Sequence, residues 1–366
     1  MKIICKQENL IKGLNKVAHL TGKNFNLPIL NNILFKVEKG NIEISATNLE
    51  VGVKTQVRGK VESEGRITVP AKIITDYINL IDSDKNIELE LINENLNISA
   101  EDWQTKIKTN SAEDYPLIPE VKGGKRNKIK FSAFKNALNA VIFAASVDET
   151  RPELTGILLW FKDKSLTLAA TNSYRLAEKT IELEEEVREE KIIVPLRSMQ
   201  EIARIVNEQE NEFFNIEFEE NQVKFEMEET IIISRLIEGE YPDYKQIIPT
   251  SFNTEVEVGV GDLIKAVKAA SLFTKIGIFD VTLDLGANGI KVRAVNAQLG
   301  ENETKLKTKH QGQEVTVVFN YKFLLDGLNN INSSEVKILI NSATNPVLFK
   351  PVGEEKYVYL VMPIKQ

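Results

Sequence analysis

A short segment recurs three times along the chain at nearly equal intervals. Its fullest form runs from Ala169 to Ala177, and shorter versions run from Ser45 to Glu50 and from Arg293 to Ala297. About 124 residues separate neighbouring copies, an interval that is too long for a solenoid and typical of a repeated domain. Each copy follows an alternating apolar run, which predicts a strand that ends in a turn. The chain is therefore expected to contain three similar domains.

The order of the expected elements repeats as well. Each third predicts a helix, a hairpin that carries the recurring segment, a second helix and three closing strands. The first helices are expected over Gln7 to Leu20, from an N-cap at Ser132, and from Gly261 to Leu263 onward. The second helices open at Val69-Pro70, Val194-Pro195 and Val318, the first of them continuing through Ile81. Helices on antiparallel sheets give each domain an α+β fold.

Turn-forming residues mark the boundaries between the repeats. They interrupt the pattern near residues 122–126 and 249–253, so we expect the three repeated domains at residues 1–122, 126–249 and 251–366. Within the repeats, strands are expected over 27–37 and 154–161, the latter followed by a turn at Asp163-Lys164. The glutamates at 184–186 and 189–190 are expected in a solvated loop.

Composition places the chain among ordinary globular proteins. Apolar residues make up 42% and charged residues 27% of the 366 positions, and no apolar run approaches the roughly 20 residues that a membrane-spanning helix needs. The beginning, Met1 to Lys6, is strand-like and lacks the apolar core of a signal peptide. The single cysteine, Cys5, excludes an internal disulfide framework and is typical of a reducing compartment. We therefore expect a cytoplasmic protein.

Charge is unevenly distributed along the chain. The net charge of −7 disfavours nonspecific binding to nucleic acid unless positive residues gather locally. The six expected helices carry about five more basic than acidic residues, which leaves about −12 for the rest. Their basic residues are Lys12, Lys16, Lys72, Lys135, Arg197, Arg204, Lys265, Lys268, Lys275 and Lys322. One positive surface could follow a phosphate backbone without reading bases, although ordinary solvated lysines explain the same pattern.

Groups that would carry catalysis are sparse. The two histidines, His19 and His310, stand in no metal-ligand or catalytic-triad spacing, and no phosphate-binding glycine loop occurs. Asp280 and Asp284 share a face of one expected strand, where a structural role is favoured over acid–base chemistry. We expect no catalytic residue, no metal site and no cofactor.

Several segments together resemble one known family. They are the three repeats, the segment that ends in Arg175-Leu176-Ala177, the segment Glu240 to Tyr244 and the ending Val361 to Ile364. Leu27 to Leu30 and Thr47 to Glu50 add to the set in the first repeat. In this order and spacing they resemble the bacterial sliding clamp, the beta subunit of DNA polymerase III, over the whole chain.

The resemblance implies a non-enzymatic processivity factor for DNA replication. Two chains would join head to tail, so that three domains from each form a closed ring with helices lining the hole and sheets outside. Sequence-independent contact with duplex DNA is expected from Lys12, Lys16, Lys23, Asn24, Lys72, Lys125, Arg126, Lys135, Arg197, Arg204, Lys265 and Lys268. The contact between chains is expected at Trp103, Lys106, Ile107 and Lys108 of one chain and Leu272, Phe273, Glu301 and Glu303 of the other.

The resemblance also implies a hydrophobic groove that binds short peptides. Its partners would be the alpha subunit of the replicative polymerase, the clamp loader and other proteins with a clamp-binding motif, and no membrane is involved. The groove residues would be Leu154, Thr171, Ser173, Tyr174, Arg175, Leu176, Pro242, Ile247, Asn320, Phe323, Pro346, Leu360, Val361, Met362, Pro363 and Ile364. Ser173-Tyr174 stands where many relatives have Gly-His, and Gln246 where a basic residue is common.

Two other functions stay open from the residues alone. A hydrolase or nuclease would need convergent carboxylates or a metal site, and metal-dependent cleavage of DNA would reveal one. A scaffold protein that binds only other proteins needs no positive surface. Charge reversal at Lys12, Lys135 and Lys265 would leave such a scaffold intact and abolish the function of a clamp.

Overall fold

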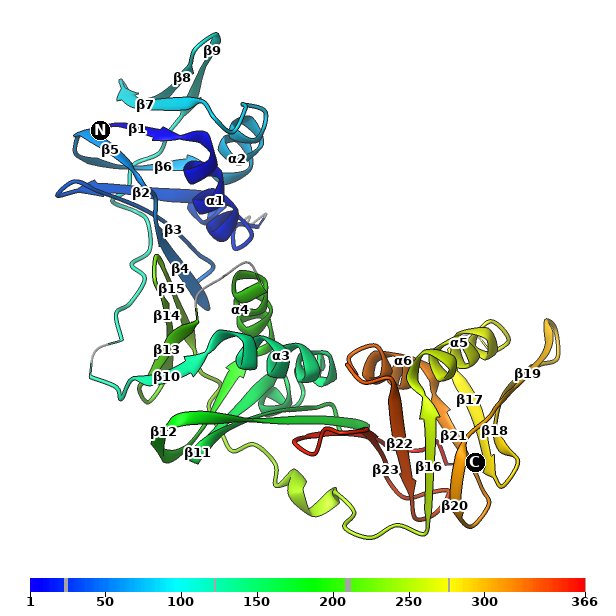
Figure 1. Cartoon of the computed structure of the whole chain (residues 1–366). Helices are drawn as coiled ribbons and strands as arrows, with labels where there is room; N and C mark the ends of the chain where they lie inside the picture. Colours follow the sequence, from blue (N-terminus) through cyan, green and yellow to red (C-terminus); the bar gives the residue numbers. More distant parts are fainter. Residues whose placement is uncertain (23–25, 122, 208–211, 276, 366) are drawn as a thin grey trace. The chain divides into compact units, whose positions relative to one another are not determined.

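The computed structural model describes residues 1–366 except 23–25, 122, 208–211, 276 and 366, and the side chain of residue 207 is also left out (Figure 1). The chain folds into two compact units. The first consists of Met1–Phe131 and Gln200–Leu236, and the second of Ser132–Met199 and Ile237–Gln366. Each unit contains two antiparallel sheets with helices, which confirms the α+β class.

The first unit is built on a five-stranded and an eight-stranded sheet. The smaller sheet has the order β5-β1-β7-β8-β9 and the larger one β10-β13-β14-β15-β4-β3-β2-β6. The strands are β1 Lys2–Lys6, β2 Asn32–Glu38, β3 Asn41–Thr47, β4 Val51–Gln56, β5 Gly59–Ser63, β6 Gly65–Pro70, β7 Asn86–Ile92, β8 Asn95–Ala100, β9 Trp103–Lys108, β10 Asn127–Lys130, β13 Phe213–Phe218, β14 Gln222–Met227 and β15 Thr230–Arg235. The helices are α1 Gln7–Ala18 and α2 Ala71–Asn79, with the 3-10 turn η1 Pro28–Asn31.

The second unit is built on a seven-stranded and a four-stranded sheet. Their orders are β11-β12-β24-β23-β22-β16-β20 and β19-β18-β17-β21. The strands are β11 Gly156–Thr171, β12 Arg175–Pro195, β16 Thr254–Gly259, β17 Asp280–Gly286, β18 Gly289–Asn296, β19 Gly300–Leu306, β20 Lys309–Gly312, β21 Val315–Asn320, β22 Glu335–Ile340, β23 Val347–Pro351 and β24 Tyr357–Val361. The helices are α3 Phe131–Val141, α5 Val260–Ser271 and α6 Tyr321–Leu328, with 3-10 turns η2 Ile142–Ala144, η3 Pro152–Leu154 and η4 Tyr244–Ile247. Helix α4, Leu196–Asn207, begins in the second unit and continues into the first.

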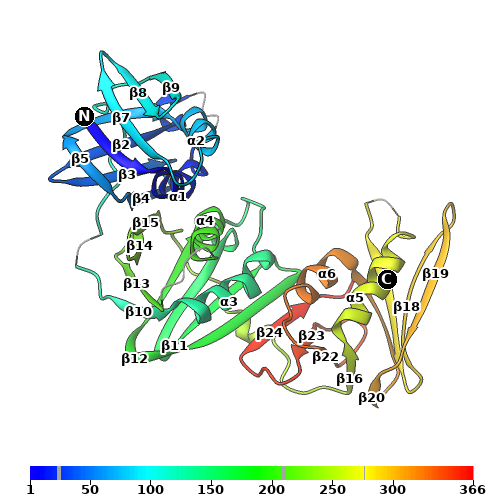
Figure 2. The same ribbon diagram turned by 45° about the horizontal axis from the view of Figure 1, so that its top comes forward.

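The helices are amphipathic, as their sequence period predicts. Helix α5 buries Leu263, Val267 and Ala270 and leaves Lys265 and Lys268 exposed. Burying each large aliphatic side chain stabilises the fold by about 1.5–3 kcal/mol, so the apolar stripe fixes which face of the helix meets solvent. Helices α5 and α6 lie side by side in both views (Figures 1 and 2). The basic residues of α5 are therefore left on its solvent face.

The asparagine of the recurring segment stabilises a hairpin turn in each repeat. The side-chain oxygen of Asn172 accepts hydrogen bonds from the N–H groups of Tyr174 and Arg175, at 3.1 and 3.0 Å. Asn48 and Asn296 each accept two backbone hydrogen bonds in the corresponding way. An asparagine that bonds to its own backbone two and three residues on is a strong turn former. The prediction of strands ending in turns is confirmed, and the asparagine explains the recurrence.

Two expectations about strands are wrong. The turn predicted at Asp163-Lys164 is a pair of irregularities inside the continuous strand β11, where Asp163 has a positive φ of 53°. The glutamates at 184–186 and 189–190 lie in the partner strand β12 rather than in a loop. Between the partners Val187 and Glu182, strand β12 has extra residues that bulge outward, and an exposed bulge tolerates charge as well as a loop does.

Several expected boundaries shift by a few residues. Residues 28–31 and 152–154 form 3-10 turns before their strands begin, because each begins with a proline that lacks a backbone donor for a sheet. Phe131 begins helix α3, so Ser132 lies inside the first turn and is not the N-cap. Helix α5 begins at Val260 and ends at Ser271, so Lys275 is not a helical base.

The ends of helices α1 and α2 also differ from those expected from the sequence. Helix α1 ends at Ala18 rather than Leu20, and helix α2 begins after Pro70, which is its N-cap, and ends at Asn79 rather than Ile81. Pro195 is the last residue of β12, and α4 follows it directly. Each second helix thus starts where a strand ends without a loop between them.

The sheets join successive sequence repeats. Strand β15 of the second repeat pairs with β4 of the first, and β24 of the third repeat pairs with β12 of the second. A compact unit therefore contains parts of two repeats. The boundaries at 122–126 and 249–251 remain our proposal for the domains, and residue 122 lies outside the described residues.

Candidate functional site: a peptide groove in the second unit

The turn between strands β11 and β12 forms one wall of the candidate groove. Thr171 Oγ1 donates a hydrogen bond to the carbonyl oxygen of Arg175 at 2.6 Å, which closes the turn. Ser173 has a φ of 72° inside it, a conformation that is uncommon for residues other than glycine and asparagine. The turn exposes Ser173 and leaves 64% of Tyr174 accessible to solvent. These two residues therefore offer side chains to a ligand.

Arg175 supports the groove from beneath. Its side chain is nine-tenths buried, and its Nη1 group lies 2.5 Å from Asp326 Oδ2 of helix α6. Its Nη2 group donates to the carbonyl oxygen of Phe143. The guanidinium also lies over the ring of Phe323, 4.8 Å from its centroid, which favours the flat stacking of cation and ring. Arg175 thus holds the ring of Phe323 in place and is not a free charge at the edge of the groove.

Strand β24 and the residues after it form the floor. Val361 pairs with Arg175, and the N–H of Met362 donates to the carbonyl oxygen of Tyr174 at 2.8 Å. The N–H of Ile364 donates to Val318 at 2.8 Å, so the terminal segment crosses from one sheet of the unit to the other. These backbone bonds hold the side chains of Met362 and Ile364, which are half-buried, at the surface.

The segment that follows β15 forms the second wall. Tyr244 is buried in a cluster with Leu158, Leu176 and Leu360, and burial raises its pKa. Lys245 adds an ion pair with the buried Glu178, at 2.5 Å. With the segment anchored in this way, Pro242 is half-buried and Ile247 is 46% exposed at the rim. Gln246 donates a hydrogen bond to Asp243 at 2.7 Å and so adds no charge.

The sixteen expected groove residues divide into a floor and a surface. The floor consists of residues at most 9% exposed, which are Leu154, Thr171, Arg175, Leu176, Leu360 and Val361, together with the buried Pro363. The surface consists of Ser173, Tyr174, Pro242, Ile247, Asn320, Phe323, Pro346, Met362 and Ile364. Sequence reasoning missed the supporting residues Phe143, Tyr244 and Asp326. The only sequence signal for Asp326 is that an arginine in an apolar strand needs an acidic partner.

The groove residues can bind a ligand, but they offer few groups that could catalyse the breaking of a bond. Its surface is apolar except for a serine hydroxyl, a tyrosine hydroxyl and an amide. Among the described residues, no three histidine, cysteine, aspartate or glutamate side chains gather as a metal site. Within the same part of the chain, no helix is both long and apolar enough to cross a bilayer. An exposed apolar surface with a few polar groups suits a short peptide.

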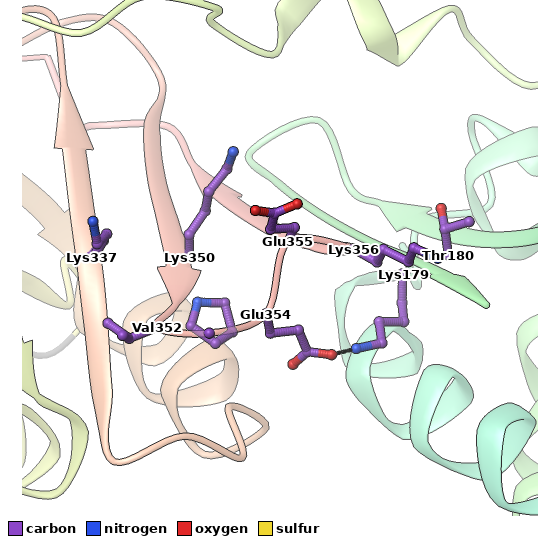
Figure 3. Close-up of a pocket in the computed structure, with 10 residues that line it drawn as sticks. Lys179, Thr180, Lys337, Lys350, Val352, Glu354, Glu355 and Lys356 are labelled. Carbon is purple, nitrogen blue, oxygen red and sulfur yellow. Dashed lines mark ion pairs between the residues drawn. The ribbon is translucent and has the colours of Figure 1, made fainter. Parts of the chain in front are cut away.

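A pocket of about 960 Å³ lies elsewhere in the second unit, around the turn between β23 and β24 (Figure 3). It is lined by lysines and glutamates. Lys179 pairs with Glu354, Lys356 with Glu182, and Lys337 Nζ lies 2.7 Å from Glu255 Oε1. These lysines are neutralised by their partners. The pocket is therefore less suited than the groove to a peptide of apolar side chains.

Some of the expected DNA-contacting residues are exposed, and others already contact groups of the protein. Lys12, Arg197, Lys265 and Lys268 are exposed on helices. Lys16 donates to Thr230 at 3.0 Å, and Arg204 donates to the carbonyl oxygens of Asn15 and Lys16, at the end of α1. Both contacts tie α1 to neighbouring segments of the first unit.

The remaining expected DNA contacts are also placed. Lys72 lies 2.5 Å from Asp76, and Arg126 lies 2.9 Å from Glu226. Lys125 is exposed beside Arg126, and Lys135 is half-buried on α3. Lys23 and Asn24 lie outside the described residues.

Most of the expected contact residues between chains lie on strands at sheet edges, and Leu272 and Phe273 directly follow helix α5. Strand β9 is outermost in the five-stranded sheet of the first unit, and β19 is outermost in the four-stranded sheet of the second (Figure 2). Lys106 and Lys108 are exposed on β9, and Glu301 and Glu303 are exposed on β19. Trp103, 42% exposed, and the buried Ile107 also lie on β9. Leu272, 73% exposed, and the half-buried Phe273 follow the end of helix α5.

Comparisons with known proteins agree over the whole chain. Residues 1–119, 128–243 and 245–365 match the models of the N-terminal, central and C-terminal domains of the DNA polymerase III beta subunit. The chain is 30% identical to the beta sliding clamp of Synechocystis and 26% identical to that of Haemophilus influenzae, covering 100% of this chain and 99% and 100% of those proteins.

Solved structures give the same result. The DNA polymerase III beta subunit of Thermotoga maritima matches with a TM-score of 0.94 and 27% identity, over 100% of this chain and 99% of that one. The sliding clamp of Pseudomonas aeruginosa, solved bound to griselimycin, matches with a TM-score of 0.95 and 25% identity over 100% of both chains. The chain belongs to the family of the DNA polymerase III beta subunit, the beta sliding clamp, which is a non-catalytic processivity subunit of the replicative polymerase.

Proposed function

We propose that two copies of the chain close head to tail into a ring around duplex DNA and tether the replicative polymerase to it in the cytoplasm. The observation that carries the proposal is the likeness to sliding clamps over the whole length of the chain. A ring holds DNA by enclosing it, so its contacts with DNA can be weak and independent of sequence.

The edge strands support the head-to-tail contact. A strand at the edge of a sheet has unpaired backbone groups that a strand of a second chain can bond. Lys106 and Lys108 give β9 a positive edge, whereas β19 carries Glu301 and Glu303, the latter 3.6 Å from Lys305 of the same strand. Opposite charges favour pairing of β9 with β19 of another chain over pairing of either strand with itself.

The exposed helix bases support contact with DNA. Lys12, Arg197, Lys265 and Lys268 stand on the faces opposite the buried stripes of their helices. Their charges can neutralise phosphates without hydrogen bonds to base edges, which is what sliding requires. We propose Lys16, Lys72, Lys125, Arg126, Lys135 and Arg204 as weaker contributors, because several of them already contact neighbouring groups.

The groove supports binding of partner peptides. Tyr174, Ile247, Phe323 and Met362 give it apolar surface from separate segments of the second unit. An extended peptide with apolar side chains would be anchored there, as a segment of the polymerase alpha subunit or of the clamp loader.

Light scattering and a DNA retention assay together test the proposal. The chain has a mass of 41.3 kDa, so we expect about twice that mass in solution at micromolar concentration. We also expect retention on nicked circular DNA and rapid loss from the same DNA after linearisation. A monomer, or equal retention on circles and on linear DNA, would contradict the ring.

A further inference from the structure

The first unit contains a second copy of the turn that forms the groove. Thr47 Oγ1 donates to the carbonyl oxygen of Val51 at 3.0 Å, as Thr171 does to Arg175. The N–H of Leu49 donates to Thr47 Oγ1 at 3.1 Å, and that of Ser173 to Thr171 Oγ1 at 3.2 Å. Leu49 has a φ of 76°, against 72° for Ser173. The two turns therefore share one backbone conformation.

The strand beside each turn is held in the same register. In the first unit, Val51 pairs with Ser234, and the N–H of Arg235 donates to the carbonyl oxygen of Glu50 at 3.0 Å. In the second unit, Met362 donates to Tyr174 in the corresponding bond, at 2.8 Å. Arg235 thus occupies the place that Met362 has in the groove.

The 3-10 turn that flanks each hairpin also matches. Leu27 precedes the turn of the first unit with φ −132° and ψ 79°, and Arg151 precedes that of the second with φ −128° and ψ 79°. Each is followed three residues later by a buried leucine, Leu30 at 2% and Leu154 at 3% exposure. Leu27 is thus the counterpart of Arg151, whose Nη1 group donates to Ser173 Oγ at 3.1 Å.

Each unit also contains a tyrosine that is at least half-buried. Burial raises the pKa of Tyr115 to about 12 and also raises that of Tyr241. The Tyr115 hydroxyl donates to the carbonyl oxygen of Asn32, directly after η1, at 3.1 Å. Proline follows each tyrosine, as Pro116 and Pro242. The Tyr-Pro pair beside the groove therefore has a counterpart of the same sequence in the first unit.

The side chains at the two sites differ in a way that suggests a ligand. Where the second unit has Arg151 and Ser173, the first has Leu27 and Leu49, which are 44% and 46% exposed. A bulky residue at positive φ is strained, and exposing its apolar surface to water adds a second cost. Leu49 has both a positive φ and an exposed apolar side chain, so it contributes little to the stability of the unliganded fold. Strain of this kind is typical of binding sites.

We propose that Leu27, Leu49 and Arg235, the leucine site, bind a short extended peptide that carries adjacent apolar side chains and a carboxylate. The two leucines would anchor the apolar side chains, and Arg235, which is exposed beside the turn, would pair with the carboxylate. The inference rests on the groove proposed for the second unit, because the two sites are compared element by element.

Equilibrium titration of the full chain tests the leucine site. The probe is a fluorescein-labelled peptide of five residues in which two leucines and a phenylalanine flank one aspartate. We expect wild type to bind two peptides per chain and Leu49→Asn to bind one. Asparagine tolerates positive φ, so this variant should melt no lower than wild type. Ile92→Asn, which removes an equally exposed residue at 44% exposure, should still bind two peptides.

A photoreactive form of the same peptide separates this inference from the groove proposal. Labelling at residues 27–50 and at residues 171–176 supports both sites. Labelling at 171–176 alone overturns the leucine site and leaves the groove intact, whereas labelling at 27–50 alone overturns the groove. A Leu49→Asn chain that still binds two peptides, or that melts well below wild type, would also overturn the leucine site. Leu27→Asn is a second, independent variant that should also bind one peptide, and a Leu27→Asn chain that binds two would likewise overturn the leucine site.

Discussion

Replacement of Arg175 by methionine should loosen the groove from beneath. Methionine keeps most of the aliphatic stem and removes the guanidinium, so the carbonyl oxygen of Phe143 loses its donor. A buried polar group without a partner costs about 1–3 kcal/mol. Loss of the guanidinium from the face of Phe323 adds about 0.5–1 kcal/mol.

The ion pair between Arg175 and Asp326 contributes less to the free energy of unfolding than its short distance suggests. The Asp326 side chain is 45% exposed, so solvent screens the pair and hydrates the carboxylate once the guanidinium is gone. A pair of this kind contributes about 0.2–1 kcal/mol. The free energy of unfolding of the second unit should therefore fall by about 2–5 kcal/mol in Arg175→Met. Asp326→Asn should lower it by less than about 1 kcal/mol.

The two tryptophans allow the second unit to be monitored separately. Trp103 lies in the first unit and Trp160 in the second, where Trp160 packs against the cluster beneath the groove. In a Trp103→Phe background, urea unfolding followed by Trp160 fluorescence reports the second unit. The control is Arg151→Met, whose side chain is 51% exposed and which should change the unfolding free energy by less than about 1 kcal/mol. A loss below about 1 kcal/mol for Arg175→Met, or an equal loss for both variants, would refute this account of Arg175.

Three further predictions concern other parts of the molecule. Burial raises the pKa of the Cys5 thiol to about 12, so at pH 8 native Cys5 should react with a disulfide reagent at least about 100-fold more slowly than Cys5 of the urea-unfolded chain, and rapid native reaction would contradict the burial. Because the pKa of the folded state is the higher one, the contribution of Cys5 to stability is present below about pH 9 and is lost as the pH rises toward 12. Lys265→Glu with Lys268→Glu should shorten the lifetime on circular DNA and flatten its salt dependence by about one unit of slope per residue, and an unchanged slope would exclude α5 from the DNA contact. Leu272→Glu, at a residue 73% exposed, should leave the circular dichroism spectrum unchanged and weaken the dimer at least about tenfold by light scattering, whereas an intact dimer would place the contact elsewhere.

The sequence predicted what depends on local pattern and periodicity. Three repeats, six helices and the hairpins after each apolar run could be predicted because an alternating strand and an amphipathic helix each leave a period in the residues. The turn asparagines Asn48, Asn172 and Asn296 could be recognised because their spacing is constant. The edge positions of β9 and β19 followed only from the resemblance to a family.

Long-range contacts could not be predicted in this way. Nothing local distinguishes Arg175, which is buried, from a surface arginine, because its partners Asp326 and Phe143 are distant in the chain. The pairing of β15 with β4 is equally invisible, since both strands have ordinary alternating patterns. The sequence likewise predicts a loop within β12, because Glu184 to Glu186 are exposed between the paired residues Glu182 and Val187 and interrupt the alternating pattern.

The two matching turns show how one backbone can support two different recognition surfaces. In each, the threonine and asparagine side chains bond to the backbone and fix the conformation, so they leave the third residue free to vary. Ser173 places a polar group there and Leu49 an apolar one, at nearly the same φ. If the turn needed its third residue for stability, that residue would be glycine or asparagine at both sites, because these relieve the strain of positive φ. The folding of the turn therefore does not explain why Leu49 stands at one site and Ser173 at the other. The ligand that each surface contacts explains the difference better.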